Sequence, residues 1–197
     1  MIAFSEIEAT AKILGVVFYH SPASSNSLPV HELLASDIQW PISANDALTL
    51  IQKGLQARDS MNAAYEELFI GTGSLMAPPW GSVYLDKENL MSGDSLMELK
   101  AFLRKTAIQL DTGMNEPEDH IGLLFFMVAV LANAKDKAHL EELLREHVLT
   151  WAYRYFELLQ QHATHPFYEG AAKLGAITIK NWQDALDIKC AEKKLYK

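Results

Sequence analysis

The sequence predicts an all-α fold, a single-domain helical bundle of about nine to eleven helices over residues 1–197. Nearly every stretch with periodic hydrophobicity repeats at the helical spacing of three to four residues. Proline and glycine separate these stretches, and no segment of useful length alternates with the two-residue period of a half-buried strand. The 197 residues are 49% hydrophobic and 21% charged, which suits one globular domain with a sizeable core.

The first half of the chain predicts four helices, which begin at Ser5, Pro29, Ser43 and Ser60. Ser5 and Glu8 have the spacing of a capping box, so the first helix is expected to begin there and to end near His20. The second helix is short and is expected to reach about residue 36. The serines at the last two starts are of a residue type that caps helices, and each is followed by an apolar stripe of helical period.

A long loop follows these helices. The stretch from Gly71 to Asp86 is the longest without a helical period, and it contains Pro78-Pro79-Trp80-Gly81, which cannot be helical throughout. A long ordered loop is more often functional than a random connection. Trp80 is predicted to be either a plug over the core or an exposed anchor for a partner.

The second half predicts five further helices, at about residues 95–107, 121–134, 135–147, 151–163 and 166–186. Ser95 and Glu98 have the spacing of a second capping box. Pro166 restarts the chain after His165, because proline suits the first helical position. A basic tail, Lys193 to Lys197, follows the last helix.

The segment Asn115–His120 carries three carboxylates and a histidine directly before the apolar run 121–134. We interpret it as the first turn of a buried helix, with Pro117 as the first helical residue. Acidic side chains in that turn would face the unpaired amides and the positive end of the helix dipole. This interpretation fixes a charged cluster on the rim of the hydrophobic core.

Composition narrows the function classes. The net charge of -8 argues against a general nucleic-acid binder, which needs a surplus of Lys and Arg. Cys190 is the sole cysteine, so no internal disulfide forms, which fits a reducing compartment. The N-terminus has no basic region of a secretory signal, and the apolar run 121–134 is shorter than the roughly 20 residues of a membrane span. We therefore expect a soluble cytoplasmic protein.

No catalytic, metal or cofactor site is predicted. The carboxylates and the histidine near Pro117 lack the spacing of a metal motif, and adjacent helical residues point about 100° apart. His162 and His165 are interpreted as a surface helix cap, and Cys190 as a cysteine with neither a catalytic nor a structural role. No nucleotide-binding motif is present. Asp119 and His120 remain open between a helix cap and a hydrogen-bond or charge partner for a bound peptide.

Five stretches together resemble one family: LGVVFY (14–19), LFIG (68–71), PPWGSVYLD (78–86), EPEDH (116–120) and HPFY (165–168). They are similar to the TorD/DmsD (NarJ-like) family of redox-enzyme maturation chaperones, and most to its DmsD branch. The matching stretches extend from about residue 4 to 185, nearly the whole chain. The tryptophan-bearing block and the acidic block are specific, and their order and spacing also match.

The resemblance implies an all-helical cytoplasmic chaperone without a cofactor. It would bind the twin-arginine (Tat) leader of a molybdopterin-containing reductase, such as dimethyl sulfoxide reductase, and delay export until cofactor insertion and folding. Contact with Tat translocase components and at most peripheral contact with the membrane are compatible with this role. Carried onto matching positions, the leader-binding surface comprises Tyr19, Leu68, Phe69, Pro79, Trp80, Gly93, Pro117, Asp119 and His120.

Three positions depart from the DmsD pattern. Tyr65 and Tyr84 stand where close relatives have tryptophan, and both keep an aromatic ring. Gly73 also stands where tryptophan is usual, which removes a whole ring from the groove. The resemblance therefore implies a groove of altered shape, in which Tyr65 and Tyr84 are counted with the peptide-binding residues.

The charge pattern agrees with a leader site. A twin-arginine leader has a basic region and an apolar region; its arginines would pair with Glu116, Glu118 or Asp119, and its apolar part would lie on Leu68, Phe69 and Trp80. Two alternatives remain. The protein is a maturation factor of the same family that binds the mature part of its client, or an enzyme that uses Asp119 and His120 with a bound metal.

Overall fold

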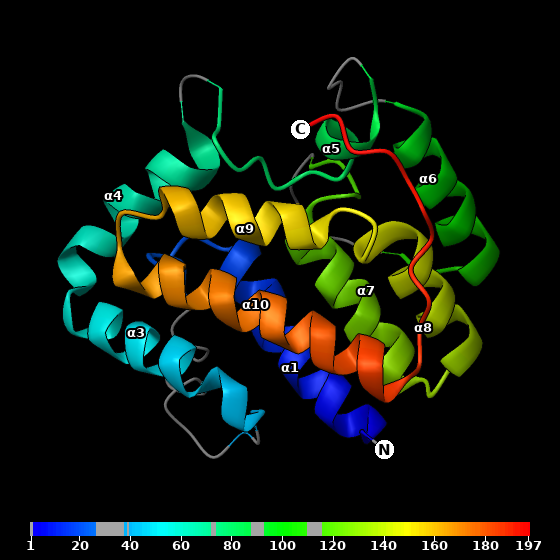
Figure 1. Cartoon of the computed structure of the whole chain (residues 1–197), viewed down its shortest axis with the longest axis horizontal. Coiled ribbons are helices and arrows are strands. Elements are labelled where there is room, and N and C mark those ends of the chain that lie inside the picture. The colour runs from blue at the N-terminus through cyan, green and yellow to red at the C-terminus, as the bar shows by residue number, and fades with distance from the viewer. Residues whose placement is uncertain (1, 27–37, 39, 72–73, 88–92, 110–115) are drawn as a thin grey trace.

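The computed structural model describes residues 2–26, 38, 40–71, 74–87, 93–109 and 116–197 (Figure 1). These residues form nine α-helices and contain no strand, which confirms the predicted all-α fold. The helices are α1 (Phe4–Tyr19), α3 (Asn45–Gln56), α4 (Met61–Tyr65), α5 (Ser82–Leu85), α6 (Asp94–Thr106), α7 (Ile121–Asn133), α8 (Lys137–Leu143), α9 (Ala152–His162) and α10 (Pro166–Ala185).

Helix α7 lies at the centre of the molecule. Its sequence is apolar on all sides, and only Phe126, Val130 and Asn133 among its residues escape full burial. A helix of this kind is stable only when other elements cover it all round. α1 packs along α7, while α10 packs against both α3 and α9, and Figure 1 shows α9 and α10 side by side.

Several expected helix caps are wrong. α1 begins at Phe4, because the backbone N–H of Ala3 donates to Glu6 Oε2 at 2.9 Å; Ser5 and Glu8 form no capping box. Glu8 instead accepts a hydrogen bond from Asn133 on α7. The Glu8 side chain, which the local spacing predicted to cap α1, therefore makes a contact between α1 and α7.

Three other serines that the sequence predicted as helix caps do not cap a helix. Ser43 lies within a 3₁₀ turn, Ile42–Ala44, that precedes α3. Ser60 occupies the N-cap position of α4, but its hydroxyl donates to the carbonyl of Ala57. Ser95 lies inside α6, and its hydroxyl donates to Asp86 at 2.7 Å.

The remaining boundaries differ by small amounts. α4 continues as a π-helical turn over Glu66–Ile70, and α8 continues as another over Leu144–Val148. α8 begins two residues later than expected, with Asp136 as its N-cap. The loop 71–86 ends in the short helix α5, which periodicity did not reveal because α5 is a single turn. The expected helix at 29–36 lies outside the described residues.

Candidate functional site

Two backbone hydrogen bonds join the tryptophan loop to the acidic segment. The N–H of Gly81 donates to the carbonyl of Asp119 at 3.2 Å, and the N–H of Ile121 donates to the carbonyl of Pro79 at 2.8 Å. Trp80 and His120 thereby form an isolated antiparallel bridge. This contact brings together the two blocks that the sequence singles out 36 residues apart (Trp80 and Glu116).

His120, and not a residue near Pro117, caps the central helix. Its Nδ1 accepts from the backbone N–H of Gly122 at 3.1 Å, so the neutral ring carries its proton on Nε2. Burial lowers the pKa of His120 to about 3. The interpretation of Pro117 as the first helical residue is wrong: residues 118–119 form a turn, in which the N–H of His120 donates to the carbonyl of Pro117.

Asp119 is a structural side chain in this arrangement. It is only 5% exposed, and its Oδ2 accepts from the backbone N–H of Ser82 at 2.6 Å. That amide belongs to the first turn of α5, where no intrahelical partner exists. Burial raises the pKa of the Asp119 carboxyl, and the hydrogen bonds from Ser82 oppose that shift. Asp119 thus caps α5 from the neighbouring segment, and Oδ1 makes no hydrogen bond within the described residues.

Trp80 lies on the rim, half-buried. Its Nε1–H donates to Glu116 Oε2 at 3.2 Å, and the edge of its ring meets the His120 ring at a centroid distance of 5.9 Å. The tryptophan is therefore fixed by the acidic segment while part of its ring stays accessible. The sequence predicted Trp80 as either a plug over the core or an exposed anchor; in the structure its ring is held in place and partly exposed.

The two partly exposed carboxylates of the acidic segment, Glu116 and Glu118, differ in their surroundings. Glu118 forms an ion pair with Lys100 of α6 at 3.3 Å, whereas Glu116 accepts a hydrogen bond from the neutral Trp80 indole and forms no ion pair with a described residue. Pro117 lies between them and is half-buried. Beside Glu118, α6 and residues 107–109 enclose a groove of about 540 Å³.

An aromatic row forms the floor beneath Trp80. The ring of His120 meets Tyr19 edge-on at 5.4 Å, Tyr65 donates its hydroxyl to the carbonyl of Tyr19, and Tyr65 lies 5.0 Å from Phe69. Burial raises the pKa of Tyr65 to about 12, so this hydroxyl stays protonated. The row is continuous from the rim to α10, and its members below Trp80 are buried.

The remaining predicted residues support the site from below or from the side. Leu68 and Pro79 are buried. Tyr84 is fully buried and stacks on Trp151 at 5.2 Å, away from His120. Gly93 is the N-cap of α6, and a Cβ there would collide with the Asp86 side chain at 2.1 Å. Gly73, where the resemblance implies a missing ring, lies outside the described residues.

Two apolar side chains that the sequence did not single out are open to solvent in this part of the chain. Ile70 follows the buried Phe69 and is 65% exposed, and Met76 precedes the Pro78-Pro79 turn and is 58% exposed. The sequence could have indicated their exposure, because neither residue falls on an apolar stripe of helical period. Lys100 was also missed, because its partner Glu118 comes from a distant segment.

Metal binding finds no support in the arrangement of donors. Across the part of the chain that the structure describes, His, Cys, Asp and Glu side chains form no group of three that could hold an ion. Asp119 Oδ2 accepts from the Ser82 amide and His120 Nδ1 accepts from the Gly122 amide, so neither of these atoms is available to a metal ion. Within the same residues, none of the helices is both long and apolar enough to cross a membrane.

The chain matches one family model, and several known chaperones are similar to it. The family described as "Nitrate reductase delta subunit" matches residues 39–157. The "Tat proofreading chaperone DmsD" of Salmonella paratyphi A is 37% identical over 98% of this chain and 96% of its own length. The "Probable Tat proofreading chaperone DmsD" of Haemophilus influenzae is 36% identical over 98% and 97%. The "Chaperone protein YcdY" of Escherichia coli K12 is 28% identical over 93% and 97%.

Proposed function

The chain belongs to the nitrate reductase delta subunit family, which includes the TorD and DmsD chaperones, and from this premise we propose that it is a Tat proofreading chaperone. In this role it binds the twin-arginine leader of a molybdopterin-containing reductase in the cytoplasm and acts without catalysis. The observation that carries the proposal is the fixed, partly exposed Trp80 beside the accessible carboxylate of Glu116, above the aromatic row.

The carboxylates divide into distinct roles toward a leader arginine. Asp119 is buried: its Oδ2 holds the Ser82 amide, and its unpartnered Oδ1 is sealed from solvent, so an arginine cannot reach it in this conformation. Glu118 is reachable but neutralised by Lys100. Glu116 is half-exposed and has no cationic partner among the described residues. We assign the first arginine to Glu116, where a guanidinium can form a charge-assisted hydrogen bond.

The apolar part of the leader then lies along the rim of the aromatic row. Leu68 and Phe69 are buried, so they form the floor and not the contact surface. The Trp80 ring offers the contact surface itself, and the exposed Ile70 and Met76 extend apolar area in the same loop region. A leader segment that covers these side chains removes exposed apolar surface from water, which favours binding.

Calorimetric titration with a synthetic twin-arginine leader tests this proposal. We expect saturable binding to the wild-type chain, and a loss of about 1–3 kcal/mol in Glu116→Gln and in Trp80→Ala, as for side chains at the centre of an interface. Glu141→Gln is the matched control, because this partly exposed glutamate pairs with Lys137 on α8, far along the chain from the site. Absence of heat with the wild type, or equal binding by all three variants, contradicts the proposal.

Two further measurements separate the alternatives. If the protein instead binds the mature part of its client, a client without its leader is still captured in a pull-down, and the leader peptide alone does not bind. If the protein is a metal enzyme, preparation without an affinity tag yields a stoichiometric ion by elemental analysis. The leader-binding proposal predicts loss of capture on leader removal and no stoichiometric ion.

A further inference from the structure

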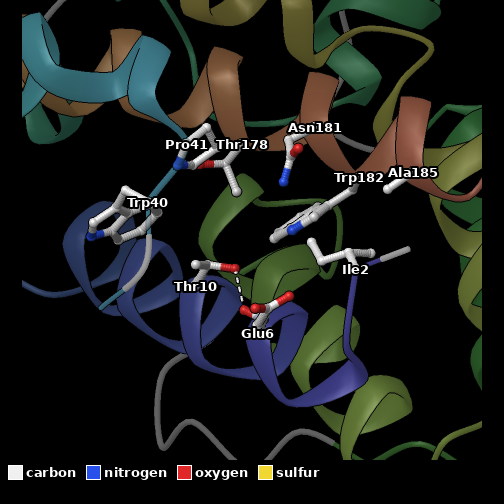
Figure 2. A pocket seen from close by; sticks show the side chains of 9 residues that line it. All are labelled: Ile2, Glu6, Thr10, Trp40, Pro41, Thr178, Asn181, Trp182 and Ala185. Carbon is white, nitrogen blue, oxygen red and sulfur yellow. Dashed lines mark hydrogen bonds between the residues drawn. The ribbon is translucent and has the colours of Figure 1, made fainter. Parts of the chain in front are cut away.

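A second pocket lies at the opposite end of α1 from Trp80. It occupies about 360 Å³ between the start of α1, residues 40–41 and the end of α10 (Figure 2). Glu6 of α1 lines this pocket, whereas Tyr19, the last residue of α1, belongs to the aromatic row. Thirteen residues of helix separate the two, a distance of about 20 Å at 1.5 Å per residue. The pocket is therefore separate from the leader site.

Two tryptophans flank the pocket. Figure 2 shows the indole of Trp40 on one side and that of Trp182 on the other, with Asn181 directed between them. Trp182 has an exposed fraction of 0%, and its Nε1–H has no hydrogen-bond partner within the described residues. That nitrogen is itself sealed from solvent, so the indole forms a wall of the pocket, and the partly exposed Asn181 amide is the donor that a ligand can reach.

The two threonines and the glutamate of the pocket offer acceptors. The hydroxyl of Thr10 donates to the carbonyl of Glu6 at 2.7 Å, and that of Thr178 donates to the carbonyl of Leu174 at 2.7 Å. Each hydroxyl oxygen therefore has only lone pairs left to offer. The carboxylate of Glu6 accepts from the N–H of Ala3 and retains further acceptor capacity.

The charge of the pocket is negative. Glu6 is exposed at its mouth, and none of the described residues that line the pocket is lysine or arginine. Figure 2 shows the half-buried Trp40 ring across the pocket from this carboxylate, with Thr10 between them. A tryptophan face and a carboxylate together attract an organic cation.

We propose that this pocket binds a basic amino-acid unit, an ammonium or guanidinium group with a carbonyl or carboxylate a few bonds away. The cation lies between Trp40 and Glu6 and pairs with the Glu6 carboxylate, while the carbonyl oxygen accepts from the Asn181 amide. The hydroxyl oxygen of Thr10, which lies between Trp40 and Glu6 in Figure 2, accepts from a remaining N–H group of the cation. A basic residue in a peptide and a free basic amino acid share this chemistry, and the site does not depend on leader binding at Trp80.

Titration of the full chain with N-acetyl-arginine amide, followed by tryptophan fluorescence and calorimetry, tests the site. We expect saturable binding, and at least a tenfold loss of affinity in Glu6→Gln, which keeps an acceptor for the Ala3 N–H and so preserves the start of α1. Glu8→Gln, on the same helix but outside the pocket, should bind as the wild type does. N-acetyl-citrulline amide, the neutral analogue, should not bind.

Two more arms keep the test decisive. Trp40→Ala removes the half-buried ring without touching α1 and should also weaken binding at least tenfold, which covers a failure of Glu6→Gln to fold. Free L-arginine distinguishes the sources: tighter binding of the blocked amide indicates a peptide, and tighter binding of free arginine indicates a metabolite. No saturable binding of either ligand, or equal affinity in Glu6→Gln and Trp40→Ala to that of the wild type, overturns the proposal.

Discussion

At the scale of single residues, the ion pair between Lys100 and Glu118 decides which carboxylates are free in the proposed leader site. The two groups are 3.3 Å apart and both partly exposed, so the pair itself contributes about 1 kcal/mol or less to stability. Its effect on binding is larger than on folding, because a bound arginine must compete with the Lys100 ammonium for Glu118. Glu116 faces no such competition among the described residues.

We therefore predict that Lys100→Met raises affinity for a twin-arginine leader by about two- to fivefold, since it frees Glu118 and removes a like charge. Calorimetry at low salt measures the change. Lys105→Met is the matched control, because Lys105 lies on the same helix but pairs with Glu142. An equal gain in both variants would attribute the effect to net charge and not to Glu118.

The buried His120 should make the folded protein less stable as the pH falls. Its pKa is about 3 in the folded state against an ordinary value of 6.5 in an unfolded chain, because burial disfavours the charged ring. Between these values the unfolded chain binds a proton that the folded chain does not, so the stability present above pH 6.5 is lost as the pH falls. At about pH 5 the loss from this residue is about 2 kcal/mol.

We predict that His120→Asn reduces the drop in unfolding free energy between about pH 7 and about pH 5 by about 2 kcal/mol relative to the wild type. Asparagine suits an N-cap, so it can still accept from the Gly122 amide. Urea unfolding at the two pH values measures the difference. The variant should retain the drop that comes from His147, because burial lowers the pKa of His147 to about 4 in both proteins. An unchanged drop in His120→Asn would exclude the buried neutral imidazole as its source.

The residues of the site show how far sequence reasoning reaches. The motif match identified Trp80, Asp119 and His120, and the structure brings them together. Their separate roles were not accessible from local patterns. Histidine is an uncommon N-cap, so local rules favoured Pro117 as the helix start, and the partner of Asp119 is the amide of Ser82, 37 residues earlier in the chain.

At the scale of elements, the crossing of α3 and α10 depends on glycine. A Cβ on Gly54 would lie 2.4 Å from the backbone nitrogen of Phe167, and one on Gly170 would lie 2.6 Å from the carbonyl oxygen of Ala47. The two helices thus approach each other through backbone contacts at both positions. Backbone cannot rotate away as a side chain can, so a methyl group at either position separates the helices.

We predict that Gly54→Ala lowers the free energy of unfolding by about 1–3 kcal/mol, although alanine is intrinsically the better helix former by about 1 kcal/mol. Urea unfolding measures the change. Lys53→Ala, at the preceding exposed position of α3, should stay within about 0.5 kcal/mol of the wild type. A Gly54→Ala protein as stable as the wild type would show that α10 shifts without cost.

Helix positions followed from the sequence much better than helix starts. Apolar periodicity is a local signal, so 121–134 and 166–186 were placed within a few residues of α7 and α10. The serine caps were wrong because side chains such as Ser95 are drawn into other contacts, here with Asp86. The short helix α5 was not predicted because a single turn shows no helical period, and the residue that caps its first amide, Asp119, comes from another segment.

At the scale of the whole molecule, the C-terminal segment contacts α5 and α6, which lie beside the candidate site. Residues 188–197 follow α10 as an extended segment, which Figure 1 shows running from the end of α10 toward α5. Lys193 forms an ion pair with Glu98 of α6, and the N–H of Tyr196 donates to the carbonyl of Tyr84 at 2.8 Å. The basic tail expected from the sequence is therefore an ordered strap over the helix that Asp119 caps.

The net charge of -8 also acts on the whole molecule. A chain of this charge attracts a basic leader from a distance, and salt screens that attraction because the Debye length falls from about 30 Å at 0.01 M to about 3 Å at 1 M. The attraction raises the association rate more than it slows dissociation. The apolar contact with Trp80 is not screened, so binding should persist in part at high salt.

We predict that raising NaCl from about 0.05 M to about 0.5 M weakens binding of the twin-arginine leader by about tenfold, mainly through a slower association rate. Surface plasmon resonance measures both rates. A leader with both arginines replaced by glutamine should bind more weakly and change less than about twofold over the same range. If the two leaders lose affinity in parallel, the salt effect does not come from the arginines, and the assignment of Glu116 as their partner fails even if the leader binds.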